Sequence, residues 1–348
     1  MTEPLLEVRG LKVDYGVGGA AVRAVVGADL TLHRGEVLGL AGESGSGKST
    51  LAYAITRLLR PPGVITGGSV RLHLAPGSTR DLLAAGAAEL RGLRWNHLAV
   101  VLQSAMHALN PVMPVGAQLT DVLQAHRPDL DRASRRARAG HLLEQVGIPA
   151  GRLGSYPHEL SGGMRQRVMI AMAIALDPQI LIMDEPTTAL DVVTQREILE
   201  ELMALRDRLG FSVLFITHDL SLLIEIADTI AVMYAGRLVE TAVARELFMA
   251  PRHPYTLGLL RSFPSLHGPR TTMTGIAGSP PDLRQLPSGC VFHPRCGYAL
   301  DRCSTESPPF AEVVPGARHA TACWLQGAEQ APPPELAGEP VAVPGSRL

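Results

Sequence analysis

The stretch Gly42-Glu43-Ser44-Gly45-Ser46-Gly47-Lys48-Ser49 decides the fold of this chain. It follows the apolar run Val37–Ala41, of the kind buried in a parallel sheet, and precedes the helical pattern of Thr50–Leu59. A G-x-x-x-x-G-K-[ST] pattern between a strand and a helix predicts a phosphate-binding loop, because its glycines let successive backbone N–H groups point at phosphate oxygens. The helix start adds its positive end. In such a loop Lys48 reaches β- and γ-phosphates, and the Ser49 hydroxyl is a ligand of Mg²⁺.

A second apolar run ends in two carboxylates. Ile180–Met183 is followed directly by Asp184 and Glu185, where a buried strand would leave its sheet. We expect Asp184 to hold Mg²⁺, directly or through water, and Glu185 to polarise a water molecule for attack on a γ-phosphate. Acidic pairs are common in loops, so this pair alone would be weak evidence. Together with the upstream phosphate loop, it indicates a magnesium site.

Length and composition exclude several classes of protein. The 348 residues exceed one ordinary domain and fit one large domain plus an extension. Lys and Arg (32) nearly balance Asp and Glu (33), which argues against a surface that binds polyanions over its whole area. Trp95–Thr120 lacks charged side chains, but its polar residues and prolines exclude a membrane span. With no secretion signal at its start, we expect a soluble, cytosolic protein.

Short apolar strands alternate with helices over most of the chain. Strands over Leu5–Val13, Ala24–Leu32 and Val213–Ile216 join those already described and predict an α/β fold with a mainly parallel sheet. Charged, Arg- and Ala-rich helix between Asp121 and Tyr156 indicates an inserted helical subdomain. After about Pro251 the periodicity fades, which marks an appended region. Residues 327–348 are rich in Pro, Ala, Glu and Gly and are expected to be disordered.

The stretch Leu160-Ser161-Gly162-Gly163-Met164-Arg165-Gln166-Arg167 resembles the signature of ABC-type ATPases. Ser161, Gly162 and Gly163 open a helix whose N–H groups and dipole favour an anion. The resemblance implies a P-loop NTPase that hydrolyses ATP with Mg²⁺, with an ABC ATPase domain over 1–250, a helical subdomain over about 104–165 and a cysteine-containing extension over 251–326. It also implies a head-to-tail dimer with a second copy or a paralogue. In that dimer Ser161 of one subunit closes on the γ-phosphate held by Lys48 of the other.

Other elements of that family fall at matching positions. Gln103 ends the strand Leu98–Leu102 and resembles the glutamine that touches Mg²⁺ and senses the membrane partner. Asp191, in Ala189-Leu190-Asp191, resembles a residue of the loop at the dimer interface. A lone histidine is usually structural, but His218 ends the strand Val213–Thr217 and resembles the histidine that orients the attacking water. Tyr15 is the candidate for stacking on adenine. With Thr50 and the whole loop Gly42–Ser49, these residues complete the expected ATP site.

Within the ABC family, the chain is most similar to the ATPase subunits of dipeptide and oligopeptide importers, the peptide and nickel uptake branch. The resemblance rests on the loop sequence, on Leu109-Asn110-Pro111 after Gln103, and on His253-Pro254-Tyr255-Thr256. It implies a peripheral protein on the cytoplasmic face of the cell membrane, bound to permease subunits and served indirectly by an extracytoplasmic binding protein. One departure is Ser104-Ala105, where this branch more often has Asp-Pro. That change bears on permease contacts and on the transported substrate.

All four cysteines lie in the last fifth of the chain. The spacing Cys290-x5-Cys296-x6-Cys303-x19-Cys323 contains no C-x-x-C pair and fits common zinc knuckles poorly. Four thiolates in a weakly periodic segment suit a soft-metal centre that staples it together. Phe292-His293-Pro294-Arg295-Cys296 resembles the importer tail, in which some members carry a [4Fe–4S] cluster. The expected group is therefore a structural [4Fe–4S] cluster, with zinc or free buried thiols as the alternatives.

Rival functions remain open on the sequence. A nickel or other small-solute importer ATPase of the same branch is one alternative. A soluble ABC ATPase acting on DNA or ribosomes is another, but it usually carries a long coiled-coil or zinc insertion or two cassettes. An exporter ATPase usually lacks the His253–Pro264 extension. The basic run Arg132–Arg138 is more often a solvated helix face than a nucleic-acid site, and we expect no nucleic-acid partner.

Overall fold

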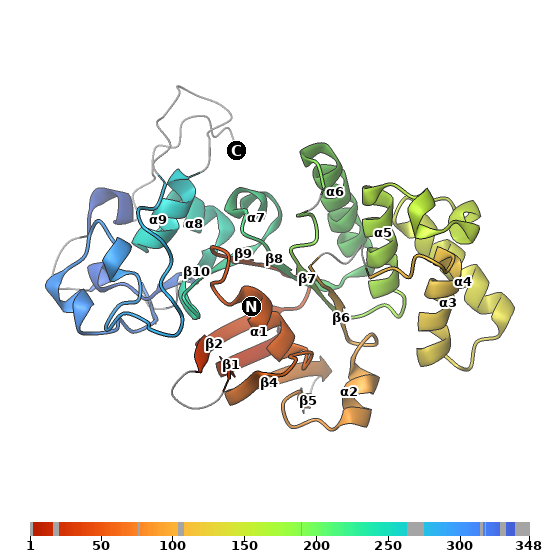
Figure 1. Ribbon diagram of the computed structural model, residues 1–348, viewed down its shortest axis with the longest axis horizontal. Helices are drawn as coiled ribbons and strands as arrows, with labels where there is room; N and C mark the ends of the chain where they lie inside the picture. Colours follow the sequence, from red (N-terminus) through yellow and green to blue (C-terminus); the bar gives the residue numbers. More distant parts are fainter. Residues whose placement is uncertain are drawn as a thin grey trace.

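The structure is a computed structural model that describes residues 3–16, 21–75, 77–103, 108–188, 190–262, 275–313, 316, 318–327 and 332–337. Its strands form two sheets (Figure 1), a central one crossing the middle of the molecule and a second one lying against it. The helical region and the C-terminal extension lie at opposite ends of the central sheet (Figure 1). No helix in the described part of the chain combines the length and the apolar character needed to cross a bilayer.

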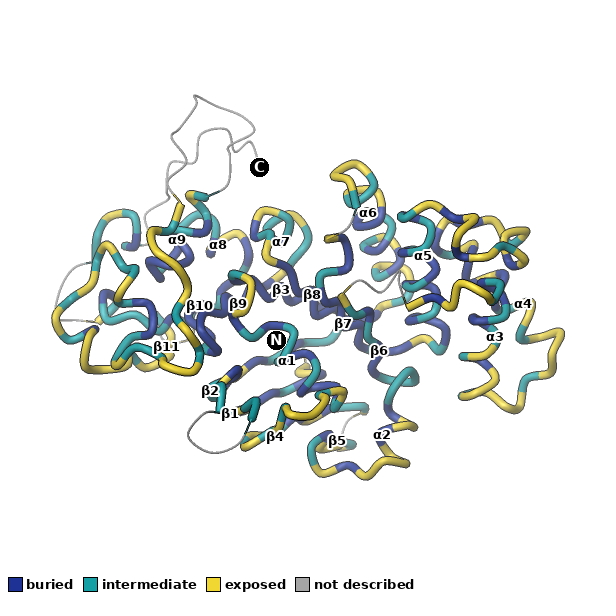
Figure 2. Tube along the Cα trace, in the orientation of Figure 1, coloured by how far each residue is buried: buried dark blue, intermediate teal, exposed yellow. Residues whose placement is uncertain are grey.

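The central sheet has the strand order β11-β12-β10-β9-β3-β8-β7-β6. The five strands from β9 to β6 run parallel, and β10, β12 and β11 pair antiparallel at one edge. Their bounds are β3 Val37–Ala41, β6 Leu98–Val101, β7 Ile180–Asp184, β8 Ser212–Ile216, β9 Thr229–Tyr234, β10 Arg237–Val243, β11 Ala311–Glu312 and β12 Ala320–Thr321. The strands β3, β7, β8 and β9 are buried along their whole length (Figure 2), as their continuous apolar runs predict. Because parallel strands end at one edge, the segments after β3, β6, β7 and β8 meet there.

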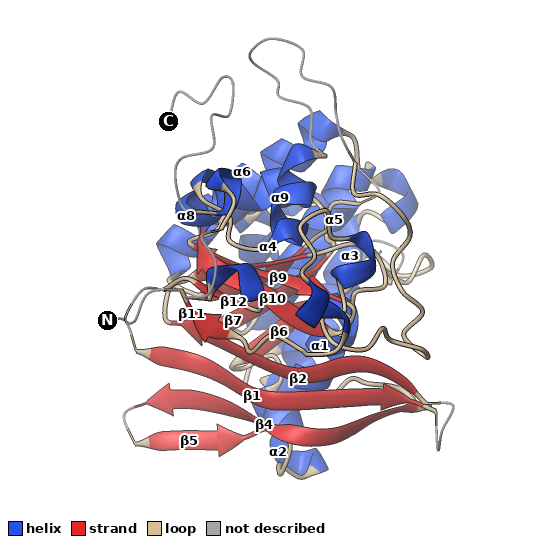
Figure 3. Cartoon of the chain, turned by 90° about the vertical axis from the view of Figure 1, so that its left-hand side faces the viewer, coloured by secondary structure: helices blue, strands red, loops and turns tan. Residues whose placement is uncertain are grey.

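The second sheet is antiparallel, with the order β2-β1-β4-β5. Its strands are β1 Pro4–Tyr15, β2 Val22–His33, β4 Gly63–Ala75 and β5 Ser78–Asp81. Helix α1, Lys48–Ile55, packs between the two sheets (Figure 3). Alternate residues of β3 face opposite layers, so that Leu38 joins the core around α1 while Val37 joins the core under the helices. The expected α/β fold is therefore present, and the antiparallel sheet is an addition to it.

Helices cover the other face of the central sheet and form the helical region. They are α3 Val115–His126, α4 Arg132–Gln145, α5 Gly162–Ala173, α6 Val192–Leu209, α7 Leu220–Ile226, α8 Ala244–Met249 and α9 Pro254–Arg261. A further helix, α2 Ala87–Leu93, lies beside β5 of the second sheet (Figure 1), and its Leu93 joins the core around α1. Close packing of α3 requires Gly116, because a Cβ there would lie 2.6 Å from the carbonyl oxygen of Leu153. The predicted helical subdomain ended near residue 165, whereas α5 continues to Ala173. The side chains at the start of α4 are mostly exposed, as a solvated helix face would be.

One attachment of the extension to the core is a buried carboxylate. Glu240 of β10 is fully buried and accepts hydrogen bonds from the backbone N–H groups of Arg252 (2.6 Å) and His253 (3.0 Å). Nε2 of His319, from the far end of the extension, lies 2.7 Å from the same carboxylate. Since β12 pairs with β10 beside this contact, the extension continues the central sheet.

The disorder expected over 327–348 does not hold for one part of that segment. Pro334–Leu336 forms a short 3₁₀ turn, and Leu336 is fully buried against Leu257 and Leu325. Glu335 accepts hydrogen bonds from Arg261 (2.8 Å) and from the hydroxyl of Tyr298 (2.9 Å). A single apolar side chain with a neighbouring ion pair anchors the turn, in a composition that otherwise predicts no core. Residues 328–331 and 338–348 lie outside the described residues.

Candidate active site

The phosphate loop is wedged between β2 and β9, and two of its glycines are sterically required. Gly42 has φ +147°, and a Cβ there would lie 2.2 Å from the carbonyl oxygen of Met233. Gly47 has φ +105°, and its Cβ would lie 2.3 Å from the carbonyl oxygen of Ala24. Any side chain at these positions would push the loop away from the sheet. The loop thus keeps one curved path into α1.

Lys48 lies inside the curve of this loop. Its ammonium group donates to the carbonyl oxygens of Gly42 (2.7 Å) and Glu43 (3.0 Å). Burial lowers the pKa of Lys48, and the nearby carboxylates, Glu185 foremost, act in the opposite direction. The side chain is 5% exposed, so its charge is held in a low-dielectric setting where an anion would feel it strongly.

The expected Mg²⁺ ligands lie together at the start of α1 and the end of β7. The Ser49 hydroxyl donates to Oδ1 of Asp184 over 3.0 Å. Asp184 is fully buried, and its Oδ2 has no hydrogen-bond partner among the described residues. Burial raises the pKa of Asp184, and the charge of Glu185 adds to that rise. An unpartnered carboxylate oxygen beside a hydroxyl is a donor set that suits Mg²⁺, so these residues fit the ion.

Glu185 contacts two of the other expected site residues and one further side chain. Its carboxylate accepts from Nε2 of Gln103 (3.3 Å) and lies 3.3 Å from Nδ1 of His218. The Thr188 hydroxyl donates to it over 3.0 Å. The Glu185 backbone has φ +45°, a left-handed conformation uncommon outside glycine. This turn directs the chain out of β7, and strain of this kind is concentrated at functional sites.

A cleft of about 640 Å³ opens over these groups. That size suits a small-molecule ligand. Tyr15 lies in its wall, with its hydroxyl 3.3 Å from Oγ1 of Thr50. The structure thus brings together, in one cleft, the expected residues Tyr15, Glu43, Ser44, Gly45, Gly47, Lys48, Ser49, Thr50, Gln103, Glu185 and His218. Leu259 and Leu283 of the extension also line it, and the sequence analysis did not anticipate them.

Ser161 of the signature and Asp191 of the expected interface loop lie outside this cleft, at the starts of two neighbouring helices. Ser161 begins α5, where its hydroxyl accepts from the N–H of Met164 (3.2 Å). Asp191 begins α6 and accepts from both the N–H and the hydroxyl of Thr194. Gly163 allows the two helices to approach, because a Cβ there would lie 2.6 Å from Cγ2 of Thr194. Within one chain, these residues therefore do not complete the site around Lys48.

Comparisons with known proteins agree with this geometry. A family model described as "ABC transporter" matches residues 25–188, and one described as "Oligopeptide/dipeptide transporter, C-terminal region" matches 239–303. A Brucella melitensis protein whose name describes a peptide import ATP-binding protein is 44% identical over 331 residues, covering 92% of this chain and 97% of that protein. The chain belongs to the ABC transporter family of ATP-binding proteins. It is therefore an ABC ATPase with the P-loop fold.

Two further relatives support this assignment. The oligopeptide transport ATP-binding protein OppD of Bacillus subtilis is 43% identical, with 95% of this chain and 92% of that protein covered. A solved structure, titled as the dimeric post-hydrolysis state of an ATP-binding cassette bound to ADP and Pi, matches with a TM-score of 0.60 and 26% identity. That match covers 69% of this ABC ATPase and 99% of the solved chain, so part of this chain has no counterpart there.

The cysteine cluster of this ABC ATPase gives a mixed result. Burial raises the pKa of Cys296 to about 11 and that of Cys323 to about 12, and neighbouring cysteines contribute to both rises. The thiols are therefore close enough to influence one another's pKa. Among the described residues, however, which include all four cysteines, no three His, Cys, Asp or Glu side chains are arranged to hold a metal ion. The expected [4Fe–4S] cluster finds no support in this arrangement, and neither does zinc.

A contact that the sequence analysis missed ties the extension to the phosphate loop. Arg295 forms a two-pronged ion pair with the carboxylate of Glu43, over 2.7 and 3.1 Å. The Tyr255 hydroxyl accepts from the backbone N–H of Glu43 over 2.8 Å. Arg295 and Glu43 are separated by 252 positions in the sequence, and no local pattern signals such a pair. The only available signal was that Glu43 stands in the phosphate loop and Arg295 in the importer-like stretch Phe292–Cys296.

Proposed function

We propose that this ABC ATPase energises the import of di- or oligopeptides through membrane permease subunits. The observation that carries the proposal is the C-terminal match over residues 239–303 to the oligopeptide/dipeptide transporter region. The names of the relatives, peptide import and oligopeptide transport ATP-binding proteins, support it along nearly the whole chain. The import of nickel or another small solute by a protein of the same branch is the alternative.

The chemistry proposed for the site follows from its groups. Lys48 and the backbone N–H groups of the loop bind the β- and γ-phosphates of ATP, and Tyr15 stacks on the adenine. Asp184, Ser49 and Gln103 would hold Mg²⁺, which would supply positive charge to the phosphates. Glu185 accepts a proton from the attacking water. His218, which contacts Glu185, orients that water. The buried position of Lys48 strengthens its attraction for the phosphates.

A head-to-tail dimer would supply the groups missing from the cleft. Ser161, Gly162 and Gly163 of one subunit would meet the γ-phosphate held by the other. Support comes from the exposed apolar side chains beside Asp191, since Val192 is 80% and Val193 is 70% exposed. Apolar side chains left in water at a helix start favour burial against a partner. The dimeric title of the solved relative is consistent with this arrangement.

The permease surface is proposed around the segment after Gln103. Val112, next to Leu109-Asn110-Pro111, is 79% exposed, which favours a docking contact there. Ser104-Ala105, the departure from the importer pattern, lies outside the described residues, so its effect on docking stays a prediction. The protein would then be peripheral, on the cytoplasmic face of the membrane, with an extracytoplasmic binding protein delivering substrate.

The [4Fe–4S] cluster stays a prediction for the extension, with Cys290, Cys296, Cys303 and Cys323 as its ligands. The electrostatic influence of the cysteines on one another supports it, and the lack of a metal-holding arrangement among the residues that the structure describes speaks against it. Anaerobic purification followed by iron and sulfide analysis tests it. Iron-free, colourless protein with four titratable thiols would remove the cluster from the account.

Transport in reconstituted vesicles tests the proposed function. The chain would be co-expressed with the permease genes next to its own gene, and the purified complex inserted into liposomes with its binding protein outside. We expect uptake of a labelled di- or oligopeptide that requires ATP on the side of this subunit and is abolished by Lys48→Ala. ATP-dependent uptake of nickel without peptide uptake would favour the alternative. A lack of any membrane complex would contradict both.

A further inference from the structure

Glu43, the second residue of the phosphate loop, is held through all of its polar groups. Its carbonyl oxygen accepts from the ammonium group of Lys48 over 3.0 Å. Its N–H and its carboxylate are both bound by the extension, through Tyr255 and Arg295 respectively. The loop residue that contacts Lys48 is therefore fixed by a part of the chain that lies outside the ATPase core in the sequence.

Arg295 is itself held firmly in place. Its side chain is 6% exposed, and its guanidinium donates to the carbonyl oxygens of Ala277 (2.9 Å) and Ile276 (3.4 Å). It also donates to the Tyr234 hydroxyl over 3.4 Å and lies over that ring. The hydrogen bonds to Glu43 raise the pKa of Arg295, so the cation is permanent. A prearranged, buried guanidinium with a forked contact is a specific partner for a carboxylate.

Tyr255 is equally constrained. It is fully buried, and its ring packs against Tyr234 with ring centres 4.6 Å apart and against Phe292 with ring centres 5.4 Å apart. The N–H of Tyr255 donates to Nδ1 of His253, which fixes the start of α9. The packing of the extension thus holds the Tyr255 hydroxyl within hydrogen-bond distance of the Glu43 N–H.

The electrostatic consequence concerns the nucleotide. A carboxylate beside a loop that binds a polyphosphate repels it, and Arg295 neutralises that carboxylate at short range. Leu259 and Leu283 of the extension also line the same cleft, which is a separate sign that this segment takes part in the site. The contacts at Glu43 and the lining of the cleft both place the extension beside the phosphate loop.

We propose that Arg295 and Tyr255 are positioning residues for the phosphate loop, through which the C-terminal extension sets the affinity of the site for the phosphate groups of ATP. Arg295 removes the repulsion that Glu43 would exert, and Tyr255 fixes the Gly42–Glu43 peptide plane, which presents the Gly42 carbonyl to Lys48. The extension is then a component of the nucleotide site as well as an appended segment.

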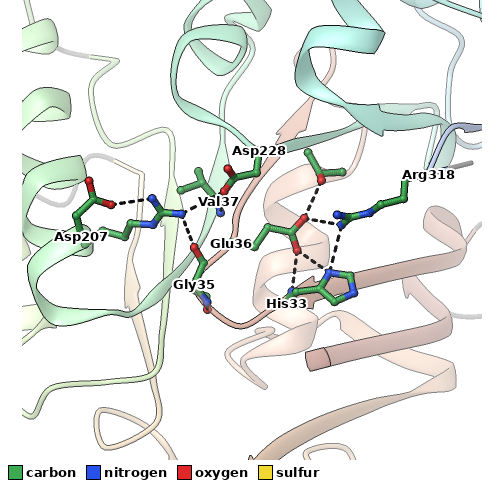
Figure 4. Close-up of polar contacts among 10 residues, drawn as sticks. His33, Gly35, Glu36, Val37, Asp207, Asp228 and Arg318 are labelled. Carbon is green, nitrogen blue, oxygen red and sulfur yellow. Dashed lines mark hydrogen bonds and ion pairs between the residues drawn. The ribbon is translucent and has the colours of Figure 1, made fainter. Parts of the chain in front are cut away.

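The matched control is a second arginine of the same extension. Arg318 pairs with the buried Glu36 over 3.1 Å, at the turn between β2 and β3 (Figure 4). Glu36 also accepts from the Thr229 hydroxyl (2.7 Å) and from the His33 N–H (2.7 Å), so it keeps partners when Arg318 is replaced. Neither Arg318 nor Glu36 lines the nucleotide cleft. Replacing Arg318, whose side chain is 55% exposed, therefore removes another ion pair between extension and core without touching the loop.

Fluorescence titration of the full-length protein with Mg²⁺ and mant-ATP tests the proposal, with folding checked by circular dichroism. Arg295→Met should weaken binding about tenfold at low salt and by less at high salt. Adding Glu43→Gln to Arg295→Met should restore most of the lost affinity, since the repelling charge is gone. Tyr255→Phe should weaken binding several-fold, and Arg318→Met should leave it within about twofold. If Arg295→Met does not fold, Arg295→Gln takes its place with the same expectations.

Two results would overturn the proposal. The first is wild-type affinity in Arg295→Met and Tyr255→Phe, because the loop would then be positioned without the extension. The second is a loss in Arg295→Met that Glu43→Gln does not relieve, or that Arg318→Met reproduces, because either would point to a general structural effect. Only a loss at Arg295 that is relieved at Glu43 supports the account.

Discussion

The hydroxyl oxygen of Ser49 lies 3.0 Å from Oδ1 of Asp184, which joins the start of α1 to the end of β7 across 135 positions of sequence. Asp184 uses only one of its two oxygens in this contact, and the other, Oδ2, has no partner among the described residues. Mg²⁺ bound with ATP would satisfy that oxygen.

Replacing Asp184 should abolish the increase in ATP affinity that Mg²⁺ causes, and should lower turnover. Asp184→Asn keeps the shape of the side chain but lacks the charge that attracts the ion. We expect ATP affinity in EDTA to stay near that of the wild type, the gain in affinity on adding Mg²⁺ to vanish, and turnover to fall at least about 100-fold. Nucleotide titrations with and without Mg²⁺ measure this. A preserved Mg²⁺ effect would show that the ion is held elsewhere.

His218 should act on turnover rather than on binding. Its Nδ1 lies 3.3 Å from Glu185, whereas the phosphate contacts proposed for the loop do not involve it. His218→Ala should lower kcat by about 100-fold and change the Kd for ATP by less than about threefold. Steady-state hydrolysis and mant-ATP titration check the two quantities separately. Equal losses in both would assign His218 to binding.

Glu240 should be critical for attachment of the extension. Glu240→Gln places an NH₂ group where the carboxylate now accepts hydrogen bonds from Arg252, His253 and His319. We expect the free energy of unfolding to drop by about 2–4 kcal/mol, measured by urea denaturation. Glu246→Gln, at an exposed position of α8, is the control and should change it by less than about 0.5 kcal/mol. Similar values for both variants would contradict this role.

The extension should also lose stability in acid because of His253. Burial lowers the pKa of His253 from 6.5 to about 4. Below about pH 6.5 the unfolded chain therefore binds a proton at this position that the folded chain accepts only near pH 4. The contribution of His253 to the free energy of unfolding should be fully present above about pH 6.5. It should be lost as the pH falls from 6.5 to 4, by on the order of 3 kcal/mol. Urea denaturation from pH 7 to pH 4 measures the slope, and His253→Gln should flatten it. An unchanged slope in that variant would assign the acid sensitivity to other groups.

Local sequence predicted the elements of the central fold well. The strands Val37–Ala41 and Ile180–Met183 stand out as continuous apolar runs, and both are buried strands, the second extended by Asp184. The rule that parallel strands end at one edge then explains why Gln103, Glu185 and His218 converge. Their roles in catalysis remain predictions, since contact in the structure does not by itself show chemistry.

Long-range pairing explains what the sequence could not predict. The strand Ala320–Thr321 is too short to carry a β-pattern and forms only because Glu240 and its neighbours receive it. Leu336 lies in a composition typical of disorder, yet it fills a site made by Leu257 and Leu325. The Arg295–Glu43 pair joins two motifs, and neither motif's sequence predicts contact with the other. Such contacts depend on tertiary packing, which periodicity does not encode.

ATP turnover by Glu185→Gln tests the central claim most directly. Glutamine keeps the size of the side chain and its contacts with Gln103 and His218 but cannot accept the proton of the attacking water. The account predicts that this variant binds ATP at least as tightly as the wild type, forms an ATP-dependent dimer by light scattering, and hydrolyses ATP at less than about 1% of the normal rate. Normal hydrolysis by the variant would contradict the account.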